Sequence, residues 1–482
     1  MKPNRRAVLL AGLATTAAGA AAVATKGAFA APPVRDIPPP PLDGELSFDQ
    51  AVRDAAADDF GHIVHKTPEA VLIPGSDNDV AATIKWVSDR NKKFAPQGQS
   101  HSTFGRSEVQ DGVVADMSAL HAVGAVEGDR ITVDAGAKWS EVLSTTLAAG
   151  KTPPVLPDYI ELSVGGTIIV GGVGATTATS GVVADNVIEM QVVTGKGDKV
   201  TCSSSSNADL FNAVRSGLGQ VGVITKATLK LVAAPASVRR IQLFYADLAT
   251  MMGDQRVLAG DNRFDSVQGS ILPSPQGGFV FRTDGVKFFT GNPPDDAALV
   301  AGLNDDPARR QAATLEYFAY LNRLAALEAA LRANGQWFFP HPWLTTFVGD
   351  SQIEAVVNAE LGQINPPNDL GQFGQVVVSP LRRSSITSPL LRVPSDELFY
   401  AFNFVRVPTT DDAANANRLV DINKAIYGRV KAAGGTLYPV SAFPLSGAEW
   451  RSHFGGGTFG QLDAAKQKFD PKKVLTPGYE IY

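Results

Sequence analysis

Short runs rich in valine and isoleucine alternate with helix-like stretches from about Leu46 to Ala234, and this alternation constrains the fold more than any other feature. The predicted strands are Ala70–Ile73, Gly112–Asp116, Arg130–Asp134, Ile188–Val193 and Val221–Leu231. The predicted helices are Val80–Asn91, Ser140–Ala149 and Ala208–Ser216. Such alternation, here dense in glycine, is typical of α/β units and predicts that the first half of the protein forms a layered domain.

A Gly-x-Gly-x-x-Gly motif spans residues 217–222. A dinucleotide fingerprint of this kind must follow a strand and open a helix, so that the pyrophosphate meets the helix N-terminus. Here the order is reversed, because helix-like residues 209–214 precede the motif and strand-like residues 221–225 follow it. The nicotinamide-type Rossmann fold is therefore excluded. These glycines either form turns or allow the backbone to approach a ligand closely.

The pattern changes after Pro235. Two strand-like runs, Arg240–Tyr245 and Gly278–Thr283, precede a long segment rich in alanine and leucine, Pro307–Asn334, which predicts a helix. This mixture indicates a second, α+β domain up to about Val407. The last forty or so residues are again rich in glycine and aromatic side chains. No repeat of about 20–50 residues is evident, which disfavours a solenoid or a propeller.

The first thirty residues have the pattern of a twin-arginine export signal. Arg5 and Arg6 precede an apolar run, and Ala28-Phe29-Ala30 offers a small-residue cleavage site. A membrane anchor is the alternative, but alanine, glycine and threonine make the run weakly apolar for a spanning helix. Residues 31–45 are rich in proline and predict a stiff leader. We expect a secreted or periplasmic protein, exported already folded around a cofactor.

Charge and composition limit the partners. Cleavage after residue 30 would remove four basic residues and no acidic one, so the formal net charge of −5 would become −9. This charge disfavours nucleic acid or an anionic membrane as a partner. Cys202 is the only cysteine, which excludes an intramolecular disulfide. Six scattered histidines without an HExxH pair argue against a zinc enzyme, so no metal site is expected.

Residues 94–106 place His101 at the centre of a loop of small and polar residues. Main-chain N–H groups in such a loop can approach a phosphate closely. The histidine could coordinate, catalyse or be covalently modified, and an ordinary surface histidine is the alternative. A second glycine cluster runs from Gly165 to Gly181. It is either a flexible surface loop or a long clamp for a polar flavin and its phosphates.

Several blocks, in order along the sequence, resemble the cytokinin dehydrogenases, which belong to the vanillyl-alcohol-oxidase flavoprotein superfamily. The blocks are the loop around His101, residues 158–167, 185–197, 209–225, 264–269, 341–344, 450–455 and 469–478. The resemblance implies an α+β, two-domain PCMH-type FAD-binding fold with an α+β substrate (cap) domain. It divides the sequence into an FAD-binding domain at 46–235, a cap domain at 236–437 and a C-terminal segment at 438–482 that returns to the FAD domain.

The resemblance also implies FAD as the cofactor and a covalent bond between His101 and the flavin 8α-methyl group. The cofactor-binding residues that it implies are Gly98, Gln99, Ser100, His101, Ser102, Gly105, Asp158, Gly165, Gly166, Thr167, Asp185, Asn186, Val187, Gly222, Ile224, Tyr438 and Tyr479. Ser100 departs from the family's glycine, and Tyr479 from its usual glutamine.

Asp158 matches the family's active-site aspartate, and Gln268 and Trp343 are the expected substrate-binding residues. Oxidising a secondary amine removes a hydride from carbon while the nitrogen loses a proton, and a desolvated carboxylate can accept that N–H. Alternatively, Asp158 has only a structural role and caps a turn after Pro157. Gln268 replaces a family glutamate that holds the purine edge, and it keeps an acceptor oxygen without the charge.

Three functions follow from these residues. The first is a secreted FAD-dependent oxidoreductase that oxidises the side chain of an N6-substituted adenine, a cytokinin, to an aldehyde and adenine. The second is a related flavin oxidase or dehydrogenase for another alcohol, polyol or amine, which Gln268 favours. The third is an exported binding protein without catalysis. In the first two, the electron acceptor is oxygen or a quinone-like compound.

Overall fold

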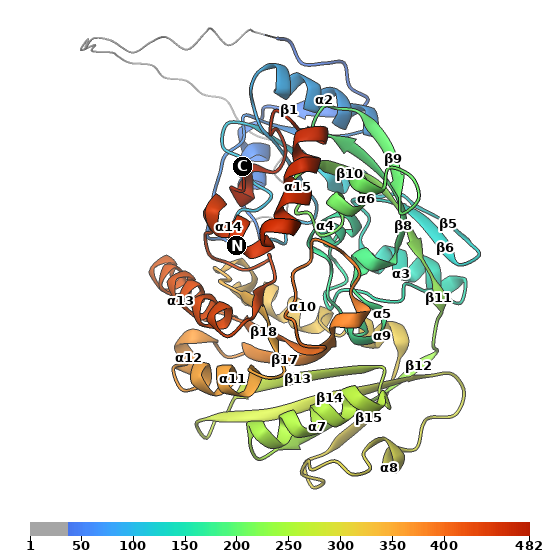
Figure 1. Cartoon of the computed structure of the whole chain (residues 1–482), viewed down its shortest axis with the longest axis vertical. Coiled ribbons are helices and arrows are strands. Elements are labelled where there is room, and N and C mark those ends of the chain that lie inside the picture. The colour runs from blue at the N-terminus through green and yellow to red at the C-terminus, as the bar shows by residue number, and fades with distance from the viewer. Residues whose placement is uncertain (1–36) are drawn as a thin grey trace.

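The computed structural model describes residues 37–482, so the predicted signal at 1–30 and the first part of the proline-rich leader lie outside the described residues. Figure 1 shows the protein as two stacked parts, with the first strands and the C-terminal helices in the upper part and the longest strands below. The mixed helix and sheet composition confirms the α+β fold class. Among residues 37–482, no helix has the length and apolarity that crossing a membrane requires.

The first sheet has four strands in the order β1-β2-β4-β3. These strands are β1 (Glu45–Ser47), β2 (Ala70–Ile73), β4 (Val113–Asp116) and β3 (Phe94–Gln97), and helices α1 (Gln50–Ala56) and α2 (Asp77–Asp89) lie between them in sequence. Strands β2, β4 and β3 run parallel, and β1 is antiparallel to β2. The C-terminal segment joins this sheet, because Phe94 donates to Val474 and accepts from Thr476 through backbone hydrogen bonds of 2.9 Å.

The second sheet is antiparallel, with five strands in the order β5-β6-β10-β8-β9. These are β5 (Val123–Glu127), β6 (Arg130–Asp134), β10 (Gly222–Lys230), β8 (Val187–Thr194) and β9 (Lys199–Ser203). The helices of this region are α3 (Trp139–Ala148), α4 (Val164–Val170), α5 (Thr177–Ser180) and α6 (Ala208–Val214). Two short strands, β7 (Lys151–Thr152) and β11 (Val232–Ala233), pair with each other.

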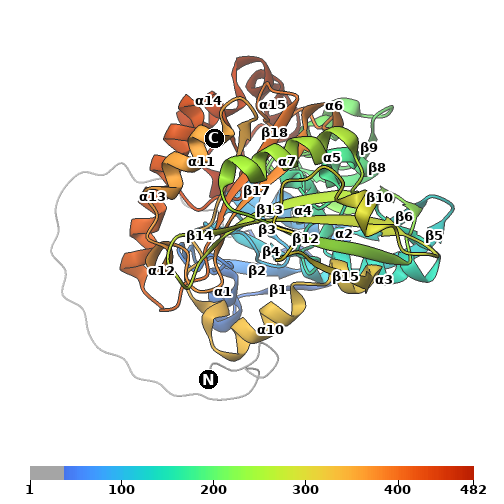
Figure 2. The ribbon, with the colours of Figure 1, turned by 90° about the horizontal axis from the view of Figure 1, so that it is seen from below.

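The third sheet has eight antiparallel strands in the order β15-β12-β14-β13-β17-β18-β16-β19. They are β12 (Ser237–Tyr245), β13 (Ser266–Pro273), β14 (Phe279–Phe289), β15 (Gln311–Glu316), β16 (Leu344–Gly349), β17 (Gln375–Arg382), β18 (Leu398–Val405) and β19 (Thr436–Leu437). Its helices are α7 (Leu248–Asp261), α8 (Asp296–Leu299), α9 (Tyr317–Leu321), α10 (Ala325–Ala333), α11 (Ile353–Leu361), α12 (Pro366–Asp369) and α13 (Ala413–Ala432). Figure 2 shows α7 and α10 on opposite sides of strands β12 and β14.

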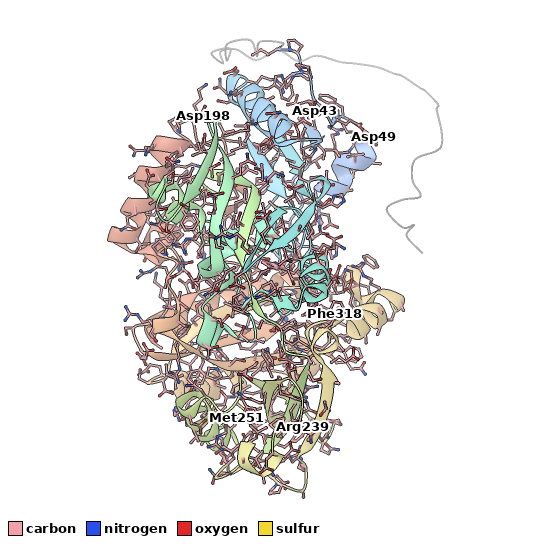
Figure 3. The ribbon with its side chains drawn as sticks, turned by 90° about the vertical axis from the view of Figure 1, so that its right-hand side faces the viewer. Asp43, Asp49, Asp198, Arg239, Met251 and Phe318 are labelled. Atoms are coloured by element: carbon pink, nitrogen blue, oxygen red, sulfur yellow. The ribbon has the colours of Figure 1, made fainter. Side chains whose placement is uncertain are left out.

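The polypeptide then returns to the upper part through α14 (Gly447–Phe454) and α15 (Gly456–Phe469). Helix α15 lies against α6, and the aliphatic residues Val474 and Leu475 join the core of the first sheet. Figure 3 shows Asp43 and Asp198 at one end of the molecule, Met251 and Arg239 at the other, and Phe318 of α9 at the junction. The junction of the two parts is therefore where α9 and α10 lie.

Three local predictions need correction. The helix predicted for Pro307–Asn334 was wrong in its first part, where residues 311–316 form β15 along the free edge of β12. Pairing with a neighbouring strand outweighs the weak helix propensity of that run. Residues 94–97, predicted as loop, form β3, and edge strands tolerate a proline such as Pro96. The start of the second glycine cluster is helix α4 rather than loop.

Candidate active site

His101 lies in the loop that follows β3, and a short segment ending at Gly61 fixes the shape of this loop. The backbone N–H of Phe60 donates to the carbonyl of Ser100 at 2.8 Å, and that of Gly61 donates to Ser102 at 3.1 Å. Ser100 has φ of 53°, a left-handed conformation that glycine adopts more readily and that the segment helps to hold. The loop therefore has one defined backbone course.

Asp59 ties the two ends of this loop together. One carboxylate oxygen accepts hydrogen bonds of 2.6 Å from the Ser102 hydroxyl and from the backbone N–H of Gly105, and the other accepts from Gly61 at 2.9 Å. Burial raises the pKa of Asp59 to about 6, although these three hydrogen bonds act to lower it. The carboxylate is therefore a buried anchor under the His101 loop.

Aromatic rings surround His101. Its imidazole stacks on Phe60 with ring centroids 4.2 Å apart, and Tyr159 lies 4.7 Å away on a different segment. The rings of Trp337 and Trp343 also border His101, with centroids 6.0 and 6.2 Å from that of the imidazole. Burial, with smaller contributions from nearby His341 and Arg332, lowers the pKa of His101 to about 3. His101 is therefore a neutral imidazole with a fixed ring plane.

The loop fits a polyanionic group such as a cofactor pyrophosphate. Within residues 37–482, no hydrogen bond joins the backbone N–H groups of residues 99–104 to another protein group. Buried or half-buried N–H groups normally find a partner, so an unpaired row of them indicates a place for an acceptor. A Cβ at Gly98 would collide with the hydroxyl of Ser163, so glycine permits this close approach to the start of α4. These residues suit FAD.

Asp158 lies next to Tyr159 and receives two side chains from the third sheet region. Arg323 donates to Oδ1 at 2.7 Å, and the amide of Gln268 donates to Oδ2 at 3.0 Å. The Asp158 side chain is 39% exposed, so part of it remains accessible to a ligand. The structure thus brings the predicted catalytic residue and a predicted substrate residue into direct contact, 110 positions apart in sequence.

Helix α4 carries the predicted glycine-rich cofactor residues. Gly165 and Thr167 are buried and Gly166 is exposed. The backbone N–H of Gly165 donates to Ala135, and the Thr167 hydroxyl accepts from the Trp139 indole at 3.0 Å. These contacts fix α4 against the second sheet, and the exposed Gly166 leaves backbone accessible beside Ser163.

Asp185, Asn186 and Val187 make no hydrogen bond to the His101 loop among the described residues. Asp185 accepts from the hydroxyls of Thr387 and Ser388 at 2.9 and 2.6 Å. The Asn186 amide donates to carbonyls of its own turn, and Val187 begins β8. The contacts of Asp185 hold the turn before β8 to the segment that follows β17.

The remaining predicted cofactor residues are buried. Gly222 and Ile224 lie in β10, where a Cβ at Gly222 would collide with the side chain of Val192 in β8. The Tyr438 hydroxyl accepts from the backbone N–H of Gly172 at 3.1 Å. The ring of Tyr479 packs against the guanidinium of Arg106 at 5.1 Å, and Arg106 itself follows the His101 loop.

Trp343, the second predicted substrate residue, borders the same aromatic group. Its ring stands edge-on to Phe60 at 5.1 Å, and its indole N–H donates to the carbonyl of Arg406 at 2.7 Å. The indole N–H is therefore used within the protein, and only the ring remains to contact a ligand.

The sequence did not single out four residues that shape this site: Asp59, Phe60, Ser163 and Arg323. Asp59 and Phe60 precede Gly61 in the sequence. This local pattern does not reveal that the segment contacts the His101 loop, which only the folded structure shows. Arg323 lies in the stretch that was expected to be one continuous helix. Its separation from Asp158 by 165 positions left no local pattern to detect.

Two family models match parts of this sequence. A family model described as "Cytokinin dehydrogenase 1, FAD and cytokinin binding" matches residues 295–482, and one described as "FAD binding domain" matches residues 68–203. The uncharacterized oxidoreductase ORF5 in the fasciation locus of Rhodococcoides fascians is 38% identical over 441 residues, which cover 91% of this protein and 99% of that one.

Cytokinin dehydrogenase 9 of Oryza sativa subsp. japonica is 32% identical over 479 residues, covering 92% of this protein and 91% of that one. The crystal structure of 6-hydroxy-D-nicotine oxidase from Arthrobacter nicotinovorans superposes with a TM-score of 0.72 and 18% identity, covering 92% of this protein and 98% of that one. This structural likeness concerns the fold alone and confirms the two-domain PCMH-type architecture. The protein belongs to the cytokinin dehydrogenase family of FAD-dependent oxidoreductases.

Proposed function

We propose that this enzyme oxidises the bond between N6 and the first carbon of the substituent in an N6-substituted adenine. The carbon next to the nitrogen loses a hydride and the nitrogen loses a proton. The imine then takes up water and splits into an aldehyde and adenine. When bound, FAD supplies the acceptor for the hydride. The observation that carries the proposal is the Asp158 carboxylate, held from two sides yet 39% exposed beside the His101 loop.

Asp158 is proposed to accept the substrate N–H. Arg323 and Gln268 each occupy one lone-pair direction of its oxygens, and a carboxylate offers about four. The lone pairs that remain can receive the N–H whose proton must leave during oxidation. A positioned acid or base of this kind typically contributes a rate factor of about 10² to 10⁴.

Gln268 is proposed to contact the substrate ring. Its amide nitrogen is used by Asp158, whereas its carbonyl oxygen accepts no hydrogen bond within residues 37–482. That oxygen can accept from a ring N–H of a purine. Trp343 would line the same space with its ring, because aromatic faces pack well against flat heterocycles.

His101 is proposed to hold the cofactor covalently. The bond would join an imidazole nitrogen to the 8α-methyl carbon of the flavin. Two observations support this role: the imidazole is neutral, with a pKa lowered to about 3, and stacking on Phe60 fixes its plane. A neutral nitrogen retains the lone pair that bonding to carbon requires.

We propose export by the twin-arginine route, on the basis of Arg5 and Arg6 and the apolar run that follows them. The electron acceptor would be oxygen or a quinone-like compound. Expression with and without residues 1–30, followed by fractionation of cells and medium, tests the export proposal. Retention of the full-length protein in the cytoplasm would contradict it.

The experiment that tests the reaction is anaerobic reduction of the flavin. Isopentenyladenine should bleach the visible flavin band of the purified enzyme, and Asp158→Ala should slow the bleaching by about 10²-fold or more. Chromatography of the products should show adenine and the matching aldehyde. An enzyme whose flavin is not bleached by any N6-substituted adenine would disprove the proposal.

A second candidate is oxidation of another amine, an alcohol or a polyol. It is favoured by Gln268, because the neutral amide lacks the charge of the glutamate that the family resemblance places there. The same anaerobic screen separates the two, since bleaching by a simple amine or polyol and not by any cytokinin would select the second.

A further inference from the structure

Helix α10 and the turn before it contact the Asp158 segment at the junction of the two parts of the molecule. Helix α9, whose Phe318 is labelled at this junction in Figure 3, leads into the turn that carries Arg323. Arg323 donates to Asp158 at 2.7 Å, and the neighbouring Tyr159 hydroxyl donates to Glu328 of α10 at 2.7 Å. The adjacent residues Asp158 and Tyr159 are thus both bound by the short segment 323–328. Asp158 accepts a hydrogen bond from this segment, whereas Tyr159 donates one to it.

Arg323 is the more buried partner of its ion pair. Its side chain is 19% exposed against 39% for Asp158, and its guanidinium lies over the ring of Tyr320 at 4.8 Å. Burial alone would lower the pKa of Arg323, but the facing carboxylate of Asp158, together with Tyr320 and Asp284, outweighs burial and raises it. A buried cation beside a carboxylate favours the ionised form of that carboxylate.

We propose that Arg323 is a positioning residue for the oxidation reaction. It fixes Oδ1 of Asp158 and places a positive charge beside it, while Gln268 fixes Oδ2, so that the free lone pairs face the substrate nitrogen. The inference rests on the proposed role of Asp158 as the acceptor of the substrate N–H. Under this inference Arg323, a residue of the cap side, sets the position of the Asp158 carboxylate on the FAD side.

Other charges near Asp158 do not take the place of Arg323. The groups within electrostatic reach of Asp158, Tyr159 or Arg323 are Tyr320 of α9, Glu328 and Arg332 of α10, Asp284 of β14 with its partners Arg240 and Arg282, and Glu161 with its partner Lys138. Lys138, Arg240, Arg282 and Arg332 each have another carboxylate as partner. Among the described residues, Arg323 is the one cation bonded to Asp158.

A purely structural role for Arg323, as a link between the two parts, makes a different prediction. The Tyr159–Glu328 hydrogen bond is a second link of the same segment and does not involve Asp158. Glu328→Gln is therefore the matched control, since it alters the junction without removing the cation. It also removes a negative charge, so any long-range electrostatic effect on Asp158 has the opposite sign from that of Arg323→Met.

The test is the pH profile of anaerobic flavin reduction by isopentenyladenine for the wild type, Arg323→Met, Arg323→Lys and Glu328→Gln. Arg323→Met should lower the limiting reduction rate and move the acid limb of the profile to higher pH by about one unit or more. Arg323→Lys should restore much of the profile, because it keeps the charge. A shift in Arg323→Met no larger than in Glu328→Gln would overturn the inference and leave the proposed reaction intact.

A substrate-free measurement separates this inference from the proposed reaction. Infrared difference spectra between high and low pH should contain a protonated-carboxyl band that Asp158→Asn removes. In Arg323→Met this band should form at higher pH than in the wild type, whether or not isopentenyladenine is a substrate. An unchanged titration of the band would reject the role of Arg323, and an unreduced flavin with a shifted band would reject only the proposed substrate.

Discussion

The side-chain amide of Gln268 donates a 3.0 Å hydrogen bond to the carboxylate of Asp158, which joins strand β13 to the segment that follows β7. The family resemblance places a glutamate at position 268. A glutamate could not donate this bond unless it were protonated. The glutamine therefore does more than remove a charge from the proposed substrate site, because it supplies a second fixed donor to the carboxylate on which the proposed chemistry depends.

Gln268→Glu should move the acid limb of the reduction profile to higher pH. Two carboxyl groups at this distance cannot both ionise readily, so they share a proton over part of the pH range. Stopped-flow reduction as a function of pH measures the effect, and Gln268→Met controls for the loss of the amide. An acid limb in Gln268→Glu that coincides with that of Gln268→Met would contradict the expectation.

His101→Ala should release the flavin on acid precipitation. The wild-type pellet should stay yellow, and the variant should leave its flavin in the supernatant, because no bond to the protein remains. His62→Gln is the control, since His62 is a partly buried histidine near the same loop that pairs with Asp58. A colourless wild-type pellet would exclude the covalent bond.

Asp59→Asn should lower the amount of flavin bound per protein. An asparagine offers one acceptor oxygen where the carboxylate serves three donors, so at least one of Ser102 Oγ and the N–H groups of Gly61 and Gly105 loses its hydrogen bond to residue 59. A buried donor left unpaired costs about 1–3 kcal/mol. Flavin absorbance relative to protein absorbance measures loading, and Asp58→Asn, which alters a more exposed neighbour, should load normally. Equal loading in both variants would show that the anchor is dispensable.

Glu108→Gln should stabilise the protein increasingly as the pH rises. Burial and the neighbouring Asp59 raise the pKa of Glu108 from 4.5 to about 8. Since the folded state then binds more protons than the unfolded state between these values, the free energy of unfolding of the wild type falls as pH rises through this window. Glutamine at position 108 does not ionise, so the variant does not lose this part of the free energy of unfolding as the pH rises.

Thermal unfolding at pH 5, 7 and 9 measures the effect. The difference in Tm between Glu108→Gln and the wild type should grow from pH 5 to pH 9. Glu127→Gln, at an exposed position, should show no such trend. A difference that stays constant with pH would mean that Glu108 does not carry a raised pKa in the folded state.

Strands and helices with strong local patterns were predicted well. The predicted strands Ala70–Ile73 and Arg130–Asp134 match β2 and β6, and the helix predicted for Ala208–Ser216 is α6. The reversed order of helix, glycine motif and strand also holds, with α6 before residues 217–222 and β10 from Gly222. Each of these elements buries one apolar face, and the regular spacing of its apolar residues is visible in a short stretch of sequence.

The weakest predictions concerned segments whose conformation depends on a distant partner. Residues 311–316 have no strand periodicity and become β15 because the edge of β12 is available to them. A backbone edge is a property of the assembled sheet, and no window of sequence contains it.

The α+β class, the flavin family and the candidate roles of His101 and Asp158 can all be inferred from the amino-acid sequence. Those conclusions rest on local periodicity and on ordered motifs, which short stretches of sequence contain. Only the tertiary structure showed that Asp59 and Phe60 hold the His101 loop and that Arg323 and Gln268 hold Asp158. Hydrogen bonds and ion pairs act over a few ångströms in space, so partners separated by tens to hundreds of positions meet only after the protein has folded.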